Sequence, residues 1–203
     1  MSGPTHREDV LRRALDALAP LTPREWEVGR AAAKLIRLEA GEPWESAGDV
    51  PSRFGVVARG LVRKYYVDVE GRERIRAFVS EGGFVGAYAA LLTGGVSELH
   101  IQALEPTELW SLDHQHLRGL AVRGEGAWER RARVLAETAF VEREGREREL
   151  LTLSATERWL ALCRREPELV ERARQKHLAS YLGITPVALS RIRARLREGR
   201  ADG

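Results

Sequence analysis

The segment QKHLASYLGITPVALSRIRARL, residues 175–196, decides the fold of the carboxyl-terminal part of this chain. Ala179 is small enough for a second helix to cross close above the first, and Gly183 supplies a turn conformation that is costly for other residues. Thr185 is a good N-cap, and Pro186 suits the first position of a second helix. Apolar residues occupy the positions that such a pair would bury: Leu178, Leu182, Ile184, Leu189 and Ile192. The spacing predicts a helix-turn-helix; a purely structural helical hairpin is the alternative.

The second helix of this motif has two faces of different character. At about 100° per residue, the inner face consists of Leu189, Ile192 and Leu196. The opposite face consists of Val187, Ser190, Arg191 and Ala194. In a helix-turn-helix docked on DNA, this outward face enters the major groove. Arg191 can then contact guanine O6 and N7, Val187 with Pro186 can contact a thymine methyl, and Ser190 can reach a base or a phosphate.

The charge of the chain is concentrated at the same end. Residues 1–150 hold 22 basic and 24 acidic side chains, whereas residues 151–203 hold 11 basic and 6 acidic ones. Such a basic end is typical of a module that binds a polyanion, and a solvated arginine-rich tail is the alternative. Arg193 and Arg195 flank the outward face, where phosphates lie, and Lys176 and His177 can join them. The candidate DNA contacts are therefore Lys176, His177, Thr185, Pro186, Val187, Ser190, Arg191, Arg193 and Arg195.

The first half of the chain has a different pattern. Two short helices are expected over residues 9–19 and 22–34, followed from Leu35 to Asp113 by short apolar or alternating segments separated by glycine-containing turns. Many short strands at even spacing predict an antiparallel β-sandwich or barrel. One piece, Ala87 to Leu92, is rich in alanine and leucine and predicts one or two helical turns within the β region.

A long helix is expected over about residues 125–150. Trp128, Ala132, Leu135 and Ala139 follow a 4-3-4 spacing, which is typical of a helix that pairs with another helix, here with a second copy of the chain. The alternative is a helix packed only on its own domain. Val134 and Val141 lie off this stripe and are expected to face the β domain. The expected organisation is a β domain over residues 1–120, a dimerisation helix and linker over 121–152, and a helix-turn-helix domain over 153–203, which begins with the capping box at Ser154.

Together these parts resemble the Crp/Fnr family of bacterial transcription regulators. The stretches that carry the resemblance are FGVVARGLVRKYYVDVEGRERIRAFVSEGGFVG in the first half and HLASYLGITPVALSRIRARL in the second. The resemblance implies an α+β chain with an antiparallel β-roll related to cyclic-nucleotide-binding domains, flanking helices, a long dimerisation helix and an all-α DNA-binding domain. It also implies a homodimer that reads a near-palindromic site in double-stranded DNA and that works with RNA polymerase, with a small-molecule effector left unidentified.

The chain departs from the family in two places. In the family's phosphate-binding cassette a glutamate holds the ribose and an arginine neutralises the cyclic phosphate, but here Ala87 stands at the glutamate position and Ser97-Glu98-Leu99 replaces the arginine region. Because the carboxylate of Glu98 would repel a phosphate, we expect no conventional binding of cyclic AMP or GMP. The candidate pocket residues are Val85, Gly86, Ala87, Tyr88 and Glu98, and the pocket is empty, takes another ligand, or is filled by side chains such as Tyr88 and Leu91. Only seven residues follow Leu196, so a full two-stranded wing is not expected.

Other classes of protein fit the sequence less well. The longest apolar run has six residues, far short of the roughly 18 that a membrane helix needs, and no secretory signal is evident, so a cytoplasmic protein is expected. Cys163 is the only cysteine, which leaves no disulfide or cysteine-ligated metal site within one chain. His114-Gln115-His116, with His100, suggests a cupin-like metal enzyme as an alternative, and a third is an interaction module that has lost DNA binding. No cofactor, no metal and no catalytic residues are expected.

Overall fold

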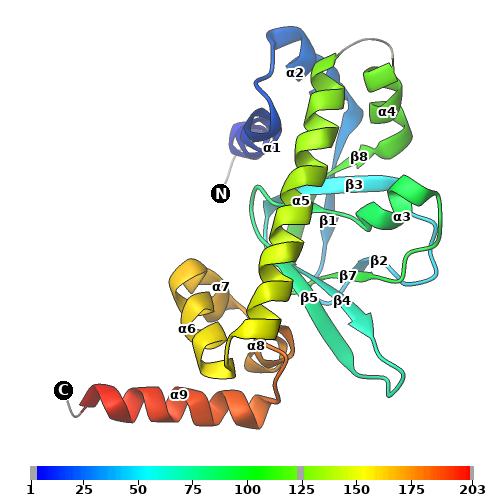
Figure 1. Ribbon diagram of the computed structural model, residues 1–203. Coiled ribbons are helices and arrows are strands. Elements are labelled where there is room, and N and C mark those ends of the chain that lie inside the picture. The colour runs from blue at the N-terminus through cyan, green and yellow to red at the C-terminus, as the bar shows by residue number, and fades with distance from the viewer. Residues whose placement is uncertain (1–3, 123–125, 202–203) are drawn as a thin grey trace.

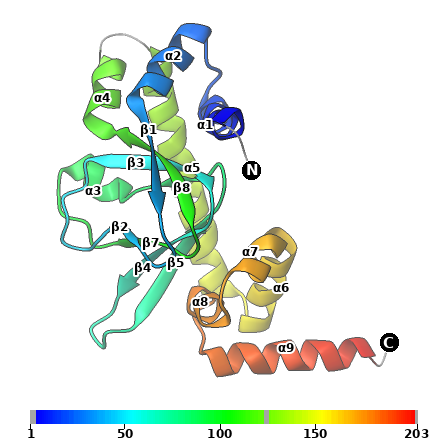
Figure 2. The same cartoon turned by 180° about the vertical axis from the view of Figure 1, so that it is seen from behind.

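A computed structural model describes residues 4–122 and 126–201 of the chain. Two helices, α1 (Pro4–Leu18) and α2 (Pro23–Ala32), precede a β-roll, and the long helix α5 (Gly126–Thr152) runs from these helices to the carboxyl-terminal helices (Figure 1). The roll lies along one side of α5, and the view from behind shows the same arrangement (Figure 2). No helix in the described ranges combines the length and apolar character needed to cross a membrane.

The β-roll consists of two four-stranded antiparallel sheets. Their strand orders are β1-β8-β3-β6 and β2-β7-β4-β5. The strands are β1 (Ala33–Leu38), β2 (Pro43–Glu45), β3 (Arg53–Arg59), β4 (Val62–Val67), β5 (Glu73–Val79), β6 (Phe84–Val85), β7 (His100–Ala103) and β8 (Thr107–Asp113). Helix α3 (Tyr88–Thr93) follows β6, and helix α4 (His114–Val122) follows β8. The predicted antiparallel β domain and its internal helix are thus present.

Alternating apolar side chains close the roll. Val57, Val62, Ile101 and Leu109 are all fully buried between the two sheets. Gly55 allows this packing, because a Cβ there would lie 2.6 Å from the ring of Trp44. The short strands β2 and β6 were not anticipated, since three and two residues are too few to show alternation, and β1 begins at Ala33, inside the range expected to be helical.

The two N-terminal helices are fixed to the roll and to α5. Thr22 and Glu25 form a capping box at the start of α2, which stabilises the helix end by satisfying its free N–H groups. The guanidinium of Arg131, on α5, is buried and donates to the backbone oxygens of Ala19 (3.1 Å) and Pro20 (2.7 Å). These bonds fix the upper half of α5 against its own domain.

The carboxyl-terminal helices α6 (Ala155–Arg165), α7 (Pro167–Arg172), α8 (Gln175–Tyr181) and α9 (Pro186–Ala201) form what we call the helical domain. Ser154 and Glu157 form the expected capping box at the start of α6. Trp159, Leu162, Leu178 and Leu189 lie in one apolar core with Leu61 and Ile75 of the roll. The helical domain therefore shares its core with the β-roll. Because α9 continues as helix to Ala201, no wing hairpin follows the motif within the described residues.

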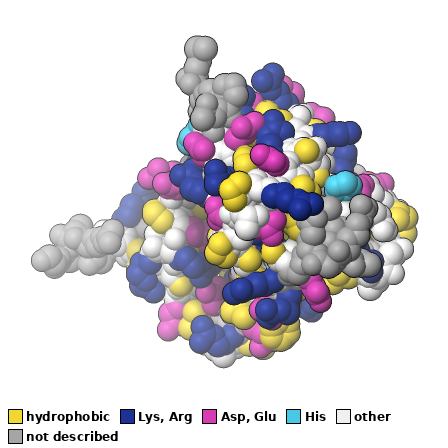
Figure 3. Space-filling view, turned by 90° about the horizontal axis from the view of Figure 1, so that it is seen from above, with side chains coloured by type: hydrophobic (Ala, Val, Ile, Leu, Met, Phe, Trp, Pro, Cys, Tyr) yellow, Lys and Arg dark blue, Asp and Glu magenta, His cyan; other side chains and the backbone are white. Residues whose placement is uncertain are grey.

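Charges of both signs are interspersed with apolar side chains on the face of the molecule seen from above (Figure 3). This face shows no single-sign patch comparable to the basic excess that the sequence places after residue 150. The basic residues after residue 150 belong to the helical domain, at the opposite end of the molecule (Figure 1).

Candidate nucleic-acid interface

Helices α8 and α9 are joined by a tight turn. Gly183 adopts a φ of 71°, a left-handed conformation that favours glycine, and the N–H of Ile184 donates to the oxygen of Ala179 at 3.0 Å. Thr185 caps α9, because the N–H of Ala188 donates to its hydroxyl oxygen at 3.2 Å. Residues 175–196 thus form two helices with the turn geometry that their spacing predicted.

The two faces of α9 differ in exposure as the periodicity indicated. Leu189 and Ile192 are buried, with exposed fractions of 0% and 4%, whereas Val187 is 60% exposed. The exposed residues on the outward side are Pro186, Val187, Ser190 and Arg191. Helix α9 lies at one end of the molecule, across the end of α5 (Figures 1 and 2). The outward face is not covered by the rest of the described chain.

The flanking basic residues differ in how freely they can reach a ligand. Arg195 and Lys176 are exposed. The guanidinium of Arg193 lies 5.6 Å from the centre of the Trp159 ring, and its Nη1 donates to Oε1 of Gln175 at 3.4 Å. These contacts are weak enough to exchange for a phosphate, since they lie at the surface.

His177 does not lie where a phosphate contact requires. Its side chain is only 6% exposed, and Nδ1 has no hydrogen-bond partner among the described residues. Burial, together with the neighbouring charge of Arg63, lowers the pKa of His177 to about 4, so the ring is neutral near pH 7. The expectation that His177 joins the phosphate contacts is therefore wrong for this arrangement, because the residue occupies the inner face of α8.

Helix α8 docks on the edge strand β5 of the roll. The hydroxyl of Ser180 donates to the oxygen of Glu73 at 2.8 Å and accepts from the N–H of Ile75 at 3.0 Å. The rings of Phe78 and Tyr181 meet edge to face, with 5.4 Å between centroids. Helix α8, which precedes α9, is thereby hydrogen-bonded to the β domain.

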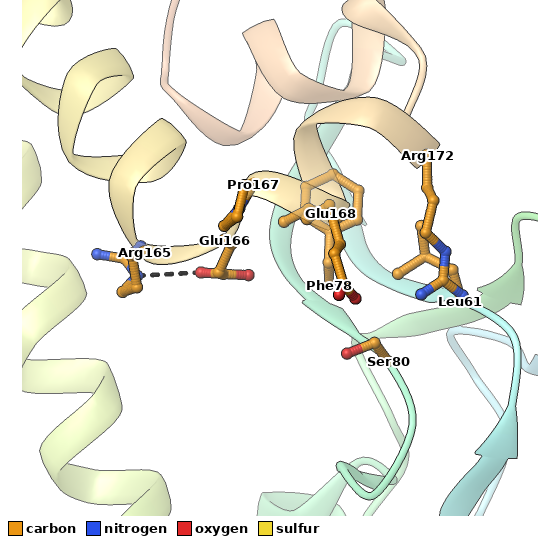
Figure 4. A pocket seen from close by; sticks show the side chains of 9 residues that line it. Leu61, Phe78, Ser80, Arg165, Glu166, Pro167, Glu168 and Arg172 are labelled. Carbon is orange, nitrogen blue, oxygen red and sulfur yellow. Dashed lines mark hydrogen bonds and ion pairs between the residues drawn. The ribbon is translucent and has the colours of Figure 1, made fainter.

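A cavity of about 320 Å³ lies beside this contact, between the roll and the α6–α7 turn (Figure 4). Its lining includes Leu61 and Phe78 from the roll and Pro167 and Leu169 from the helical domain. Arg165 pairs with Glu149 and Glu166, and Arg172 pairs with Glu81 and Glu105. Because both guanidiniums already bind carboxylates, the cavity is part of the junction between the two domains.

The residues expected to form an effector pocket are only partly together. Val85 and Ala87 are buried in the roll, with exposed fractions of 1% and 5%, beside the buried Gly86. Tyr88 is half-buried, and its hydroxyl donates to the oxygen of Ala132 on α5 at 3.4 Å. Glu98 is exposed, whereas its neighbour Ser97 is 2% exposed. This exposure sets Glu98 apart from the buried Val85, Gly86 and Ala87.

The four residues of the stripe expected to form the dimer interface differ in exposure. Trp128 is 4% exposed and packs against the backbone of Gly29 on α2, so its assignment to the interface was wrong. Leu135 and Ala139 are half-buried, and only Ala132 is exposed. The large apolar side chains that α5 presents to solvent in its middle are Phe140 (64%) and Val141 (67%). Val141 therefore does not face the β domain as expected.

The three histidines of the metal-enzyme alternative are not arranged as that reading requires. His114 and His116 begin helix α4, where residues two apart do not share a face. His114 is buried, and burial lowers its pKa, whereas His116 is exposed. His100 stacks on Tyr65 with 4.9 Å between ring centres.

Three functional candidates escaped the sequence reasoning: Ser180 at the domain junction, and Glu45 and Lys64 inside the roll. Glu45 lies in a strand of three residues, and Lys64 follows the charged Arg63 in β4, so neither stood out. Neither pattern carried a signal of burial. For Ser180, its place next to the buried Ala179 in the first helix of the motif was a signal that its hydroxyl needs a hydrogen-bond partner within the protein.

Comparisons with known proteins agree with this geometry. Residues 35–123 match the family model described as the cyclic nucleotide-binding domain. Comparison with curated proteins finds no match. Among solved structures, the catabolite activator protein of Thermus thermophilus is 24% identical, with a TM-score of 0.57 over 92% of this chain and 87% of that one. FixK2 of Bradyrhizobium japonicum is 19% identical, with a TM-score of 0.68 over 82% and 85%.

A third similar structure covers the first part of the chain. It is the N-terminal domain of a transcriptional regulator from Streptomyces coelicolor, 26% identical, with a TM-score of 0.55 over 67% of this chain and 96% of that one. Similarities at these identities establish the fold. The expected resemblance and fold class are confirmed. Residues 35–123 carry a cyclic nucleotide-binding domain, and the chain as a whole has the fold of the Crp/Fnr-type transcription regulators.

Proposed function

We propose that this chain is a homodimeric, sequence-specific DNA-binding transcription regulator of the Crp/Fnr type. The observation that carries the proposal is the exposed face of α9. Val187 and Arg191 are exposed to solvent on this face, and Thr185 caps the start of the helix. Leu189 and Ile192, on the opposite face, are buried in the core of the helical domain. A helix supported in this way can enter the major groove with its first turns against the bases.

The side chains on this face suit direct reading of base pairs. Arg191 offers a fork of donors for guanine, and Val187 offers an apolar surface for a thymine methyl. Arg193, Arg195 and Lys176 lie around them as phosphate contacts. The hydroxyl of Ser190 can contact either a base or a phosphate. His177 is left out of this set because it is buried.

Dimerisation is proposed to use the outer side of α5. Phe140 and Val141 are neighbours in the sequence and are both about two-thirds exposed, at 64% and 67%. Exposed apolar pairs on a long helix are costly unless a second surface covers them. A second copy of α5 is the occupant that the proposed function requires. A dimer then presents two α9 helices to half-sites about one helical turn, or roughly 34 Å, apart. RNA polymerase is the further partner that such a regulator would need.

The experiment that tests the proposal is selection of bound fragments from random double-stranded DNA, followed by mobility shifts at rising salt. We expect a near-palindromic consensus and an affinity that falls steeply with salt, because phosphate contacts release counterions. A variant with Arg59→Ala on β3 and Arg118→Ala on α4, two exposed arginines outside the helical domain, is the matched control and should bind as the wild type does. Failure to enrich any sequence would contradict the proposal.

A further inference from the structure

The turn between α8 and α9 leaves two backbone oxygens without a backbone partner. The N–H groups of Gly183 and Ile184 donate to oxygens in the last turn of α8, each at 3.0 Å. This pair of bonds is the Schellman motif, which ends many helices at a left-handed glycine. The oxygens of Tyr181 and Leu182 come next, and no backbone N–H of the described residues donates to either. Such oxygens at a helix end need partners from elsewhere.

Two arginines from outside the motif donate to these two oxygens. The Nη2 of Arg146, on α5, donates to the oxygen of Tyr181. The Nε of Arg158, on α6, donates to the oxygen of Leu182 at 3.1 Å. The helix dipole also favours a cation here, because its C-terminal end is negative. The end of α8 is thus capped by side chains of two other helices.

Arg158 binds the end of α5 with the same guanidinium. Its Nη1 donates to the oxygen of Leu153 at 2.6 Å and to that of Leu150 at 3.4 Å. Because the guanidinium is planar and its donors point in fixed directions, it holds the end of α5 and Leu182 in one geometry. The side chain of Leu150 also touches the turn, since its Cδ2 lies 3.4 Å from the place of a Cβ on Gly183.

Arg146 is fixed by further contacts around the Tyr181 ring. Its guanidinium lies 4.0 Å from the centre of that ring, within the range of a cation–π contact. Its Nη1 lies 3.5 Å from the carboxylate of Glu149, which also pairs with Arg165 of α6 at 2.6 Å. The side chain of Arg146 is only 17% exposed, so water screens these contacts less than it would at the surface. The ends of α5 and α8 and the helix α6 therefore form one unit.

We propose that Arg146 and Arg158 are positioning residues that fix α9 to the end of α5 and so set the spacing between the half-sites that a dimer reads. The inference rests on the proposed function, in which α5 pairs with its copy and α9 enters the major groove. Arg146 follows Phe140 of the proposed interface by six residues, or about 9 Å along the helix. So short a link passes the placement of α5 in the dimer directly to α9. The bases are read by other side chains, so spacing and base choice can be measured separately.

The test measures the affinity of the full-length protein for its selected near-palindromic site and for two altered sites. The altered sites carry one base pair more, or one fewer, between the half-sites. Each change turns one half-site by about 35° and moves it by about 3.4 Å relative to the other. A rigid dimer must deform the DNA to reach both half-sites, so the wild type should bind the altered sites at least about tenfold more weakly.

Arg158→Met and Arg146→Met should each reduce this spacing penalty to about threefold or less, because α9 can then shift relative to α5. Both variants should also bind the unaltered site more weakly than the wild type does, since the two α9 helices are less well pre-organised. Their base preferences within each half-site should remain those of the wild type. Arg148→Met removes an exposed arginine from the same helix and should keep the full spacing penalty.

The spacing penalty separates positioning from a loss of stability. An unfolded fraction lowers the apparent affinity for all three sites alike, so their ratio changes only when the placement of α9 changes. If Arg158→Met does not fold, Arg158→Lys takes its place. Lysine keeps the charge but has no planar fork of donors, so its spacing penalty should lie between those of the wild type and Arg146→Met.

The outcomes distinguish the inference from the proposed function. A full spacing penalty in folded Arg146→Met and in the Arg158 variant would overturn the inference and leave the proposed function standing. An equal loss of the penalty in Arg148→Met would also overturn the inference, because the effect would then follow charge rather than contacts with the turn. A wild type that selects no sequence, or that tolerates every spacing, would overturn the proposed dimeric reader together with the inference.

Discussion

The hydroxyl of Ser180, in helix α8, donates to the backbone oxygen of Glu73 on the roll's edge strand β5 at 2.8 Å. The N–H of Ile75 completes the contact by donating to the same hydroxyl. One side chain thus does for β5 what a neighbouring strand would do. Two strand groups depend on it for their hydrogen bonds.

Ser180→Ala should therefore loosen the junction between the roll and the helical domain. The change leaves two partly buried backbone groups without partners, which costs about 1–3 kcal/mol of unfolding free energy. Urea unfolding and hydrogen exchange of the Ile75 amide measure the effect. Ser80 lines the same junction, and its hydroxyl forms no hydrogen bond with the described residues, so Ser80→Ala is the control. An Ile75 amide that exchanges at the wild-type rate in Ser180→Ala would show that the contact contributes nothing.

Arg191→Ala should reduce sequence selectivity at one base position of each half-site and leave weak, non-specific binding. A bidentate contact from arginine to guanine discriminates by about 1–3 kcal/mol. Competition mobility shifts with each single-base variant of the selected site measure this loss. Arg195→Ala is the comparison, because a phosphate contact weakens all sequences alike. If Arg191→Ala also weakens every sequence equally, Arg191 contacts a phosphate instead.

Phe140→Glu should convert the dimer to a monomer. A buried carboxylate opposite its own symmetry copy introduces both desolvation and repulsion, so dimer affinity should fall at least about tenfold, or about 1.4 kcal/mol. Sedimentation equilibrium gives the association constant, and binding to a palindromic site should weaken in parallel. Val50→Glu alters an equally exposed apolar residue in a loop of the roll and should leave the dimer intact. Unchanged association in Phe140→Glu would place the interface elsewhere.

The stability of the protein should fall on acidification because of His177. Its pKa is about 4 in the folded chain, against 6.5 when solvated, with Arg63 and Glu73 of the roll and Arg174 and Lys176 of its own segment around it. Between pH 6.5 and 4 the unfolded chain binds a proton that the folded chain does not. The free energy of unfolding is therefore highest above pH 6.5, where His177 is neutral in both states. It falls as the pH drops toward 4, by as much as roughly 3 kcal/mol.

His177→Gln should flatten this pH dependence. Urea unfolding at several values between pH 4.5 and 7.5 gives the slope for each protein. His116→Gln changes an exposed histidine and should keep the wild-type slope. Identical slopes for His177→Gln and the wild type would mean that other groups account for the acid sensitivity.

Much of the architecture was predictable because its signals are local. Gly183, Thr185 and the apolar positions around them fix a turn and two helices within about twenty residues, and short apolar or alternating segments between glycine-containing turns mark the longer strands of the roll. The orientation of α5 was not predictable in this way. A stripe such as Trp128–Leu135 can be buried by another subunit or by the same chain, and periodicity does not tell these apart.

The interior charges of the roll were hidden for a related reason. Glu45 and Lys64 lie 19 positions apart, and only the pairing of both strands with β7 brings them to the same face. A single sequence shows which residues are charged, but register decides which of them are buried. The same holds for His177, whose basic neighbours suggested a surface position.

The contact of Ser180 with β5 has a consequence for solubility. An uncovered edge strand is a template onto which other chains can add by continuing the sheet. Here α8 occupies that edge. The helical domain thus protects the β-roll from aggregation through this edge. A fragment ending before residue 153 would expose the edge of β5, which α8 covers in the intact chain.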